Sequence, residues 1–273
     1  METPGKTQGP RFVDAHIHLK QSSGIDSLRA AGIVAARDAG MREPVAPAIR
    51  DARSPTIISA QWALYKKGGY GSLFGVPVET REDIQDQILK LKAAGAGIIK
   101  VMASGMVSLK EPGTVTAGGF SREELSFIVA LARSHSLEVM AHANGEAAII
   151  DAAFAGVRSI EHGFFMSEPA LAVMAAKGTF WTPTAGALSR AAQAAGMRDG
   201  QHFIARLIQA HLVMVARAER INVPLAIGTD CVLPDPAYGA AYQAELAYFE
   251  QAGIPRERVI AIACENGARL LGI

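Results

Sequence analysis

Six side chains of the sequence are of the types that bind divalent metal ions in proteins. They are His16, His18, Lys100, His142, His162 and Asp230. Each closes a short apolar segment with the composition of a β-strand, so all six could meet at one end of a parallel barrel. Histidine nitrogens and carboxylate oxygens are ligands for zinc and similar divalent ions. The order of these residues therefore predicts a hydrolytic metal site.

The His-x-His pair lies in the first apolar segment. Side chains alternate between the two faces of a strand, so Asp14, His16 and His18 share one face. Ala15 and Ile17 point the other way, toward the predicted helices, and the two imidazoles would face the barrel axis. The pair is weak evidence by itself, because a buried histidine with structural hydrogen bonds gives the same pattern.

Lys100 lies inside the apolar run Ile98-Ile99-Lys100-Val101-Met102. A lysine in such a strand must either bury its ammonium group or lower its pKa until the amine is neutral. A neutral lysine can react with carbon dioxide, and the resulting carbamate is an anionic oxygen ligand that can bridge two divalent cations. The alternative is a lysine at the strand end whose ammonium group reaches solvent.

The later candidates each follow directly on a predicted strand, at the barrel end where such enzymes place their reactive groups. His142 and His162 would supply nitrogen ligands, and Asp230 follows Gly228, which permits a tight exit from the last strand. The Asp230 carboxylate could bind a metal and transfer a proton, or it could cap the following segment. Surface or helix-sheet packing roles are expected for the histidines of the predicted helices, His135, His202 and His211.

Short β-rich segments alternate along the chain with longer amphipathic ones. This alternation predicts an α/β fold, a (β/α)8 TIM barrel in a single domain. The expected strands are Phe12–His18, Ile33–Arg37, Thr56–Gln61, Gly97–Met102, Glu138–Ala141, Arg158–Glu161, Thr179–Thr182 and Leu225–Gly228.

Local signals place several helices and loops. Thr80 and Ser121 each begin a capping box, with an acidic residue three positions later, and Pro255 can begin the last helix. Two long stretches that are poor in periodicity, 62–80 and 104–121, are expected to be substrate loops.

The composition is that of one barrel domain. A chain of 273 residues, 49% of them hydrophobic, can fill the interior of a barrel of about 250 residues and its helical ring. Lys and Arg number 27 against 26 Asp and Glu, without a basic stripe, so nucleic acid is not an expected partner. The whole chain, 1–273, is expected to form the barrel, with residues 1–10 as a flexible leader.

Cysteine usage and the N-terminus indicate the compartment. Cys231 and Cys264 lie far apart without a CxxC motif, which favours a reducing environment. Met1–Pro10 lacks the apolar core of a secretory signal, and no apolar run approaches the ~18 residues of a membrane span. A cytoplasmic protein without a membrane partner is therefore expected.

Together these motifs resemble the amidohydrolase superfamily, specifically its members with a carboxylated lysine at the end of strand four. The surroundings of Lys100 and His142 look most like the imidazolonepropionase-like and dipeptidase-like branch. The motifs stand in family order over nearly the whole chain, as Val13–Leu19, Ile99–Gly105, Ala141–Gly145, Ile160–Gly163 and Gly228–Asp230.

The resemblance implies two divalent metal ions, typically zinc. By position, one ion would be held by His16, His18 and Asp230 and the other by His142 and His162, with carboxylated Lys100 and a hydroxide as bridges. In the family the metals activate the shared water and polarise the scissile carbonyl, while the aspartate transfers the proton. Catalytic roles are therefore expected for Asp230, Lys100 and His142.

Two features depart from the family pattern. Most relatives carry a small β-sandwich formed by segments before the first strand and after the last helix, whereas here the predicted barrel occupies almost the whole sequence. We expect this domain to be absent, which would expose barrel surface and favour a homo-oligomer. Cys231 stands where relatives commonly have a smaller residue, and it is expected to pack. The alternative is an oxidation-sensitive thiol near the metals.

Candidates for binding a small-molecule substrate are Arg37, Tyr70, Asn144 and Tyr238. Arg37 ends the second strand and could pair with a substrate carboxylate, or it could form an internal ion pair with Asp38 or Glu161. The other three lie in or beside the expected loops and could form hydrogen bonds with a substrate.

The leading hypothesis is a metal-dependent hydrolase that cleaves an amide or cyclic amide C–N bond of a small molecule, such as a dipeptide or an acyl-amino acid. One alternative is a lactonase or phosphotriesterase-like ester hydrolase on the same site. Another is a mononuclear deaminase or imidazolone hydrolase with Lys100 unmodified. Outside catalysis, the alternative is a barrel that binds a ligand without turnover.

Overall fold

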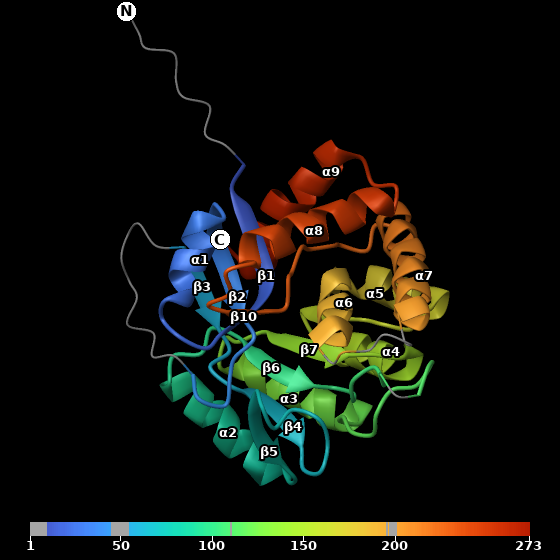
Figure 1. The fold of residues 1–273 in the computed structure, drawn as a ribbon. Coiled ribbons are helices and arrows are strands. Elements are labelled where there is room, and N and C mark those ends of the chain that lie inside the picture. The colour runs from blue at the N-terminus through green and yellow to red at the C-terminus, as the bar shows by residue number, and fades with distance from the viewer. Residues whose placement is uncertain (1–9, 45–54, 110, 195, 197–200) are drawn as a thin grey trace, which may run out of the picture.

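Strands and helices alternate along the chain, and Figure 1 shows the helices arranged around the strands. The structure is a computed structural model that describes residues 10–44, 55–109, 111–194, 196 and 201–273. The expected flexible leader lies outside the described residues, apart from Pro10.

All paired strands run parallel to their neighbours. The assigned strands are β1 (Phe12–Leu19), β2 (Ile33–Asp38), β3 (Thr56–Ser59), β4 (Ala63–Lys66), β5 (Gly75–Val78), β6 (Ile99–Met102), β7 (Val139–Ala143), β8 (Ser159–His162), β9 (Phe180–Thr182) and β10 (Cys231–Leu233). They form two sheets, in the orders β10-β1-β2-β3 and β5-β4-β6-β7-β8-β9.

Backbone hydrogen bonds join the two sheets into one ring. Between β3 and β6, the N–H of Gly97 donates to the carbonyl oxygen of Ser59 at 2.9 Å. Between β9 and β1 lies the segment 224–230, which bonds to both strands. The ring of β1, β2, β3, β6, β7, β8, β9 and this segment confirms the expected α/β fold, a (β/α)8 TIM barrel.

The eighth barrel strand, expected at Leu225–Gly228, is more irregular than the others. Leu225 forms an isolated parallel bridge with Trp181. Ala226 donates its N–H to the Trp181 carbonyl at 2.9 Å, and Ala15 of β1 donates to the Ile227 carbonyl at 2.8 Å. The segment therefore joins β9 to β1 as a strand would, although it does not form a continuous ladder of hydrogen bonds with either.

Gly228 is required in this segment by close packing. A Cβ atom at position 228 would lie 2.4 Å from Cγ2 of Thr182 and 2.9 Å from Cβ of His16. The glycine thus allows the eighth strand to lie against β9 and β1, rather than providing the tight exit that the sequence suggests.

One of the two expected loops contains regular structure. The segment 62–80 includes β4 and β5, which pair with each other, and Ala63 of β4 lies opposite Lys100 of β6. The loop prediction is wrong here because two four-residue strands have too few alternating positions to reveal a period. The segment 104–121 is irregular as expected, apart from an antiparallel bridge between Val107 and Val115.

The helices lie outside the barrel strands in Figure 1. They are α1 (Gly24–Ala30), α2 (Arg81–Ala93), α3 (Arg122–Ser134), α4 (Glu146–Ala155), α5 (Glu168–Lys177), α6 (Ala185–Ala194), α7 (Gln201–Arg220), α8 (Tyr238–Gln251), α9 (Arg256–Ala261), the π-helical turn η1 (Ile262–Asn266) and α10 (Gly267–Leu271). None of the helices in the described ranges is long and apolar enough to span a membrane.

The predicted helix starts are confirmed. Thr80 and Asp83 form a reciprocal capping box at α2, and Ser121 and Glu124 form another at α3. Each box satisfies backbone donors that the first helical turn leaves unpaired. Pro255 is the N-cap of α9, where the last predicted helix begins.

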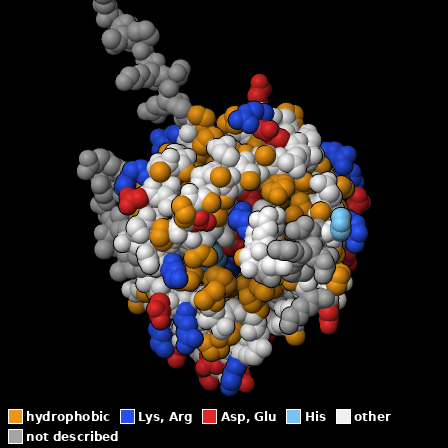
Figure 2. Space-filling view, in the orientation of Figure 1, with side chains coloured by type: hydrophobic (Ala, Val, Ile, Leu, Met, Phe, Trp, Pro, Cys, Tyr) orange, Lys and Arg blue, Asp and Glu red, His pale blue; other side chains and the backbone are white. Residues whose placement is uncertain are grey.

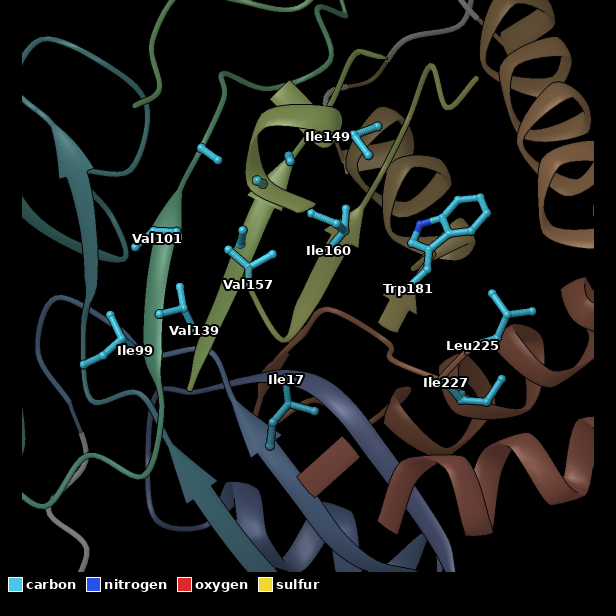
Figure 3. Packing of buried hydrophobic residues seen from close by; sticks show 14 of the residues in the cluster. Ile17, Ile99, Val101, Val139, Ile149, Val157, Ile160, Trp181, Leu225 and Ile227 are labelled. Atoms are coloured by element: carbon cyan, nitrogen blue, oxygen red, sulfur yellow. The ribbon is translucent and has the colours of Figure 1, made fainter. Parts of the chain in front are cut away.

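The apolar side chains of the strands pack between the barrel and the helices. Figure 3 shows members of this cluster from consecutive strands, including Ile99, Val139 and Ile160. Because side chains alternate, Lys100 points away from the cluster that buries its neighbours Ile99 and Val101. The same alternation that builds the outer core therefore places polar side chains inside the barrel.

Candidate metal centre

Two histidines of β1 and the aspartate after the eighth strand form the middle of the site. Nε2 of His16 lies 3.3 Å and Nε2 of His18 lies 3.2 Å from Oδ1 of Asp230. One potential ligand atom from each residue lies within 4.8 Å of the other two. Both histidines are buried, and the Asp230 side chain is 24% exposed. The structure thus brings together the three residues predicted to hold the first metal.

His142 and His162, from the ends of β7 and β8, lie beside this group. Their ring centroids are 4.6 Å apart, and the His162 ring is 5.1 Å from that of His16. Nδ1 of His162 lies 3.9 Å from Oδ2 of Asp230. The pair predicted for the second metal is therefore adjacent to the first three residues.

The β1 histidines are each held through one ring nitrogen. Nδ1 of His16 pairs with Oε2 of Glu161 at 2.8 Å. Nδ1 of His18 donates to the carbonyl oxygen of Gly40 at 2.6 Å. These contacts leave Nε2 of both rings directed at Asp230.

The other two histidines are held in the same way. Nδ1 of His162 bonds to the Thr184 hydroxyl at 2.8 Å, and Nε2 of His142 donates to the carbonyl oxygen of Gly105 at 3.0 Å. Metal-binding histidines almost always have such a partner, which fixes the ring and leaves the opposite nitrogen for the metal. All four rings meet this condition.

Two buried nitrogen atoms of the site make no hydrogen bond within the described residues. They are Nε2 of His16 and Nζ of Lys100. A buried polar atom without a partner costs about 1–3 kcal/mol, so it indicates a missing ligand. Four imidazoles, a carboxylate and a lysine are a donor set that fits divalent metal ions, zinc among them.

Lys100 is 1% exposed, so its amine does not reach solvent. Burial lowers the pKa of Lys100 to about 8, although the charges of Glu161 and Asp230 act in the opposite direction. This confirms the expected burial and excludes the solvent-reaching alternative. At neutral pH part of the amine is unprotonated, which is the form that reacts with carbon dioxide.

Electrostatics keep the remaining ligands in their metal-binding forms. Burial, followed by the charge of Lys100, lowers the pKa of His142 to about 3. Burial and His142 lower the pKa of His162 well below its ordinary value, so both rings are neutral. Burial alone would raise the pKa of Asp230, but the charge of the neighbouring His16 outweighs it and holds that pKa well below its usual range.

His162 and Asp230 have unusual backbone conformations. Their φ angles are 66° and 56°, in the left-handed region that residues other than glycine rarely adopt. Thr184, the partner of His162, has a φ of 47°. Such conformations cost roughly 1–3 kcal/mol each and cluster at functional sites. At His162 the turn also explains how two consecutive residues, Glu161 and His162, can both contact the site.

Arg37 forms the internal ion pair with Glu161 that the sequence offers as the alternative to a substrate-binding role. The side chain is buried, and its Nε donates to the carbonyl oxygen of Ala15 at 2.8 Å. Nη1 donates to the Ser159 hydroxyl at 2.9 Å, and Nη2 donates to Oε1 of Glu161 at 2.8 Å. Because its guanidinium is used internally, Arg37 acts on the site through Glu161, which in turn holds His16.

The Tyr238 side chain is buried away from the candidate site, contrary to its predicted substrate role. It is 1% exposed, and its hydroxyl donates to Oδ2 of Asp14 at 3.0 Å. The same carboxylate accepts the Thr229 N–H at 3.1 Å and the Thr229 hydroxyl at 2.8 Å. Asp14 and Tyr238 therefore fix the residue that precedes Asp230.

A cavity of about 110 Å³ opens beside the metal-binding residues. Figure 2 shows a hollow in this face, in which histidine, acidic and basic side chains are surrounded by hydrophobic ones. The cavity is lined by Tyr70, Met106, Val107, Leu109, His142, Asn144, His162, Phe164, Ala187, Leu188, Ala191 and Asp230. Its wall is mainly apolar, with the metal-binding residues on one side.

Two of the predicted substrate residues do line this cavity. The Tyr70 ring lies 5.0 Å from the His142 ring, and burial raises the pKa of the Tyr70 hydroxyl, which stays protonated. Asn144 uses its Oδ1 to accept the Phe164 N–H at 3.0 Å and its Nδ2 to donate to the Gly105 carbonyl at 3.3 Å. Their contacts with a substrate stay predictions.

The residues expected to have surface or packing roles have them. His211 of α7 is buried, stacks on Phe164 with ring centroids 4.3 Å apart, and bonds through Nε2 to the Pro183 carbonyl at 3.1 Å. His135 is the C-cap of α3 and His202 is exposed on α7. Burial raises the pKa of the Cys231 thiol to about 12, which leaves the thiol protonated and unreactive.

Two supporting residues were not assigned a role in the site from the sequence. Glu161 orients His16, and Thr184 orients His162. A carboxylate inside a buried strand is a usable signal for the first, because such a group needs an internal partner. Thr184 follows a predicted strand by two residues and carries no signal beyond that position.

Comparison with known proteins places these features in context. Residues 10–273 match the family model described as Amidohydrolase family. The chain is 28% identical to the ochratoxinase of Aspergillus niger over 276 residues, which covers 88% of this chain and 56% of that protein. The chain thus spans little more than half the length of this curated relative.

Solved structures share the fold. A Xaa-Pro dipeptidase with bound methionine has a TM-score of 0.82 and 23% identity, and the match covers 97% of this chain and 75% of that chain. The crystal structure of A. niger ochratoxinase has a TM-score of 0.79 and 24% identity, covering 96% of this chain and 71% of that chain. At these identities the likeness establishes the barrel fold.

Proposed function

The chain belongs to the amidohydrolase family, and from that premise we propose that it is a metal-dependent hydrolase of an amide C–N bond in a small molecule. The observation that carries the proposal is the convergence of His16, His18 and Asp230. The rings of His142 and His162 lie beside them, and the buried Nζ of Lys100 has no hydrogen-bond partner among the described residues. In each histidine the nitrogen not used for metal binding already has a hydrogen-bond partner, so the site is organised before a metal arrives.

The side chains divide into two sets of ligands. His16, His18 and Asp230 would hold one divalent ion, and His142 and His162 would hold a second, with zinc favoured by the nitrogen-rich set. Metal ions bound there supply Lewis acidity, which activates water and polarises the scissile carbonyl.

Lys100 would join the two sets after it reacts with carbon dioxide. The Nζ lone pair of Lys100 forms a bond to the carbon of CO2, and the nitrogen releases one proton, which leaves an anionic carbamate. Its two oxygens are suitable ligands for two cations. The buried, unpaired Nζ and its lowered pKa of about 8 support this step.

Asp230 would transfer the proton in this proposal. Its pKa is held well below the usual range, so the carboxylate is ionised at neutral pH and can accept a proton from the attacking water. It also lines the cavity, from which it can deliver that proton to the leaving nitrogen. An amide nitrogen needs this proton in order to depart as a neutral amine.

The cavity supports a substrate of the dipeptide or acyl-amino acid type. It is small and mainly apolar, so it suits a short apolar group next to the amide. One of the similar solved structures is a Xaa-Pro dipeptidase, and we extend the same substrate class to this chain.

The test combines metal analysis with a substrate panel. Protein purified without chelators is analysed by elemental mass spectrometry and assayed with dipeptides, N-acyl amino acids, lactones and organophosphates. We expect close to two metal ions per chain and turnover of the amides. His142→Ala should lose metal and turnover, whereas His202→Ala, an exposed histidine of α7, should keep both.

Other outcomes would replace the proposal. Close to one metal ion per chain, unchanged by substitution of Lys100, would favour a mononuclear deaminase or imidazolone hydrolase. Turnover of lactones or organophosphates without turnover of any amide would favour the ester hydrolase.

A further inference from the structure

Arg190 of α6 lies next to the metal centre, although it is not one of the metal-binding residues. Helix α6 covers the cavity, with Ala187 and Ala191 in its lining. Arg190 follows Ala187 by three residues, so it lies on the same face of the helix. Its Nη2 donates to the carbonyl oxygen of Thr229, which directly precedes Asp230. The guanidinium is therefore held against the backbone of the residue that precedes Asp230.

The charge of Arg190 is only weakly compensated. Its one ion pair among the described residues is with Glu245, where Nη1 and Oε1 are 3.9 Å apart. Glu245 is fully buried, and burial raises the pKa of its carboxyl to about 8, even though Arg190 lowers it. Glu245 is thus largely protonated at neutral pH, and the guanidinium keeps a net positive charge.

Gly186, one turn before Arg190, makes room for the guanidinium. A Cβ atom at position 186 would lie 2.8 Å from Nη1 of Arg190 and 2.7 Å from Oε1 of Glu245. The Gly186 N–H also donates to Oε1 of Glu245 at 2.8 Å. The glycine therefore leaves space in α6 for the arginine, whose side chain is 33% exposed.

Arg190 lies next to the lining of the cavity and is not itself part of it. The residues that line it include neither lysine nor arginine. Arg37, the arginine that the sequence suggests, is buried and fully engaged with Ala15, Ser159 and Glu161. Figure 2 shows basic side-chain surface at the edge of the hollow, near acidic and histidine surface. A ligand carboxylate entering this hollow would meet a positive charge supplied from α6.

We propose that Arg190 binds a free carboxylate of the substrate. A guanidinium has five N–H donors in a planar fork that matches a carboxylate, and the interactions above leave several of them available. The site would then select amides with a carboxylate close to the scissile bond, such as dipeptides with a free C-terminus and N-acyl amino acids. This inference rests on the proposed amide hydrolysis and names the group that selects the substrate.

The kinetic test compares two substrates that differ in the carboxylate. N-acetyl-L-leucine carries it, and N-acetyl-L-leucinol replaces it with an alcohol. For the metal-loaded wild type we expect a clear preference for the acid. Arg190→Met should lower kcat/KM for the acid by roughly 10- to 200-fold, the range for a hydrogen bond to a charged group, and leave the alcohol nearly unchanged.

Three further variants sharpen the result. Arg190→Lys keeps the charge but lacks the planar arrangement of N–H donors. Its kcat/KM for the acid should therefore lie between the values of Arg190→Met and the wild type. Gly186→Ala keeps the arginine but crowds Nη1, and it should give a smaller loss that is again confined to the acid. Arg206→Met, an exposed arginine of α7, is the matched control and should change neither substrate.

A purely structural role for Arg190 predicts a different result. If Arg190 only fastens α6 to Thr229, Arg190→Met lowers kcat/KM equally for both substrates and lowers the melting temperature, and the proposal is overturned. Equal turnover of acid and alcohol by the wild type also overturns it.

Calorimetric binding separates this inference from the proposed function. Wild-type protein should bind N-acetyl-L-leucine at least 10-fold more tightly than Arg190→Met does, whether or not the ligand is cleaved. Selective binding without turnover would uphold Arg190 and refute the hydrolase assignment. Equal affinity of the two proteins would refute the role of Arg190, even if amides are hydrolysed.

Discussion

The buried series Arg37, Glu161 and His16 shows how a residue without substrate contact can control a metal ligand. Burial alone would raise the pKa of Glu161, but Arg37 and the hydrogen bond with His16 outweigh it, so the pKa lies well below its usual value. The ionised Glu161 then accepts from both neighbours. Removing one partner of a buried ion pair leaves an uncompensated charge, which is why such pairs are sensitive to substitution.

Arg37→Met is therefore expected to destabilise the protein. The loss should be about 3–5 kcal/mol in free energy of unfolding, because Glu161 loses the guanidinium that balances its buried charge. Metal affinity should fall by roughly 10- to 100-fold as His16 loses its fixed orientation. Urea unfolding and metal competition measure the two effects. Arg29→Met, which removes an exposed ion pair with Asp26, is the control. A change in KM without a change in stability or metal affinity would instead support a substrate-binding role for Arg37.

Lys100→Ala should remove metal and nearly all turnover. The substitution deletes the only atom in our proposal that can become the bridging carbamate, so metal content per chain should fall well below that of the wild type. Added acetate or propionate should restore part of both, by supplying a carboxylate to the space that the lysine vacates. Lys90→Ala, in an exposed position of α2, should behave as the wild type. Unchanged metal content in Lys100→Ala would contradict the bridging role.

At the scale of elements, α6 and α8 meet around a buried carboxyl group. Glu245 of α8 accepts the N–H of Gly186 at the start of α6, while its Oε2 makes no hydrogen bond within the described residues. Burial raises its pKa from 4.5 to about 8. The neutral form is therefore the stable one in the folded protein, and this links the packing of the two helices to pH.

The sign of this linkage can be tested with Glu245→Gln. Glu245 contributes stability that is fully present below its unfolded pKa near 4.5, and that is lost as the pH rises toward 8. Glutamine does not titrate, so the free energy of unfolding of the variant should rise relative to that of the wild type between pH 4.5 and 8. The relative rise should be roughly 3–5 kcal/mol at most. Urea unfolding at pH 5, 6.5 and 8 measures the difference. A difference that does not change with pH would show that Glu245 is ionised in the folded protein.

At the scale of the whole molecule, the metal ligands come from strands that lie far apart in the chain. His16 and His18 are on β1, whereas Asp230 follows the eighth strand, which closes the ring against β1. A metal bound across this closure would connect the first and last strands of the barrel. Binding to the folded state alone stabilises it by mass action.

Metal removal should therefore lower the melting temperature. A free metal concentration of 100 times the dissociation constant stabilises the folded state by about 2.7 kcal/mol. For a chain of this size each kcal/mol corresponds to roughly 2–4 °C, so chelation should lower the melting temperature by several degrees. Differential scanning calorimetry before chelation, after it and after return of zinc measures the effect. An unchanged melting temperature would place any bound metal outside the barrel closure.

Several properties of the whole molecule stay predictions. A homo-oligomer is expected if the barrel surface is uncovered, and size-exclusion chromatography with light scattering would test it, with a monomer as the contrary result. The cytoplasmic location, the extent of the single domain and the absence of nucleic-acid and membrane partners are expectations of the same kind.

Local patterns in the sequence determined the barrel and the positions of the candidate metal-binding residues. Strand alternation has a period of two, so a polar residue such as Lys100 between buried Ile99 and Val101 must face the opposite side. The carboxyl ends of parallel strands meet at one end of a barrel, so the positions of His142 and His162 followed from chain order. The capping boxes of α2 and α3 were equally local, because their partners are three residues apart.

Tertiary structure alone decided which side chains face the cavity. Arg37 reaches Glu161 across 124 positions of the chain, and this contact turns a candidate substrate residue into an internal ion pair. Arg190 lies in a helix without any local signal, and its proposed role depends on the contact of α6 with Thr229. Partners so distant in the chain leave no periodicity to read, since their proximity is set by the closure of the barrel and the packing of helices on it.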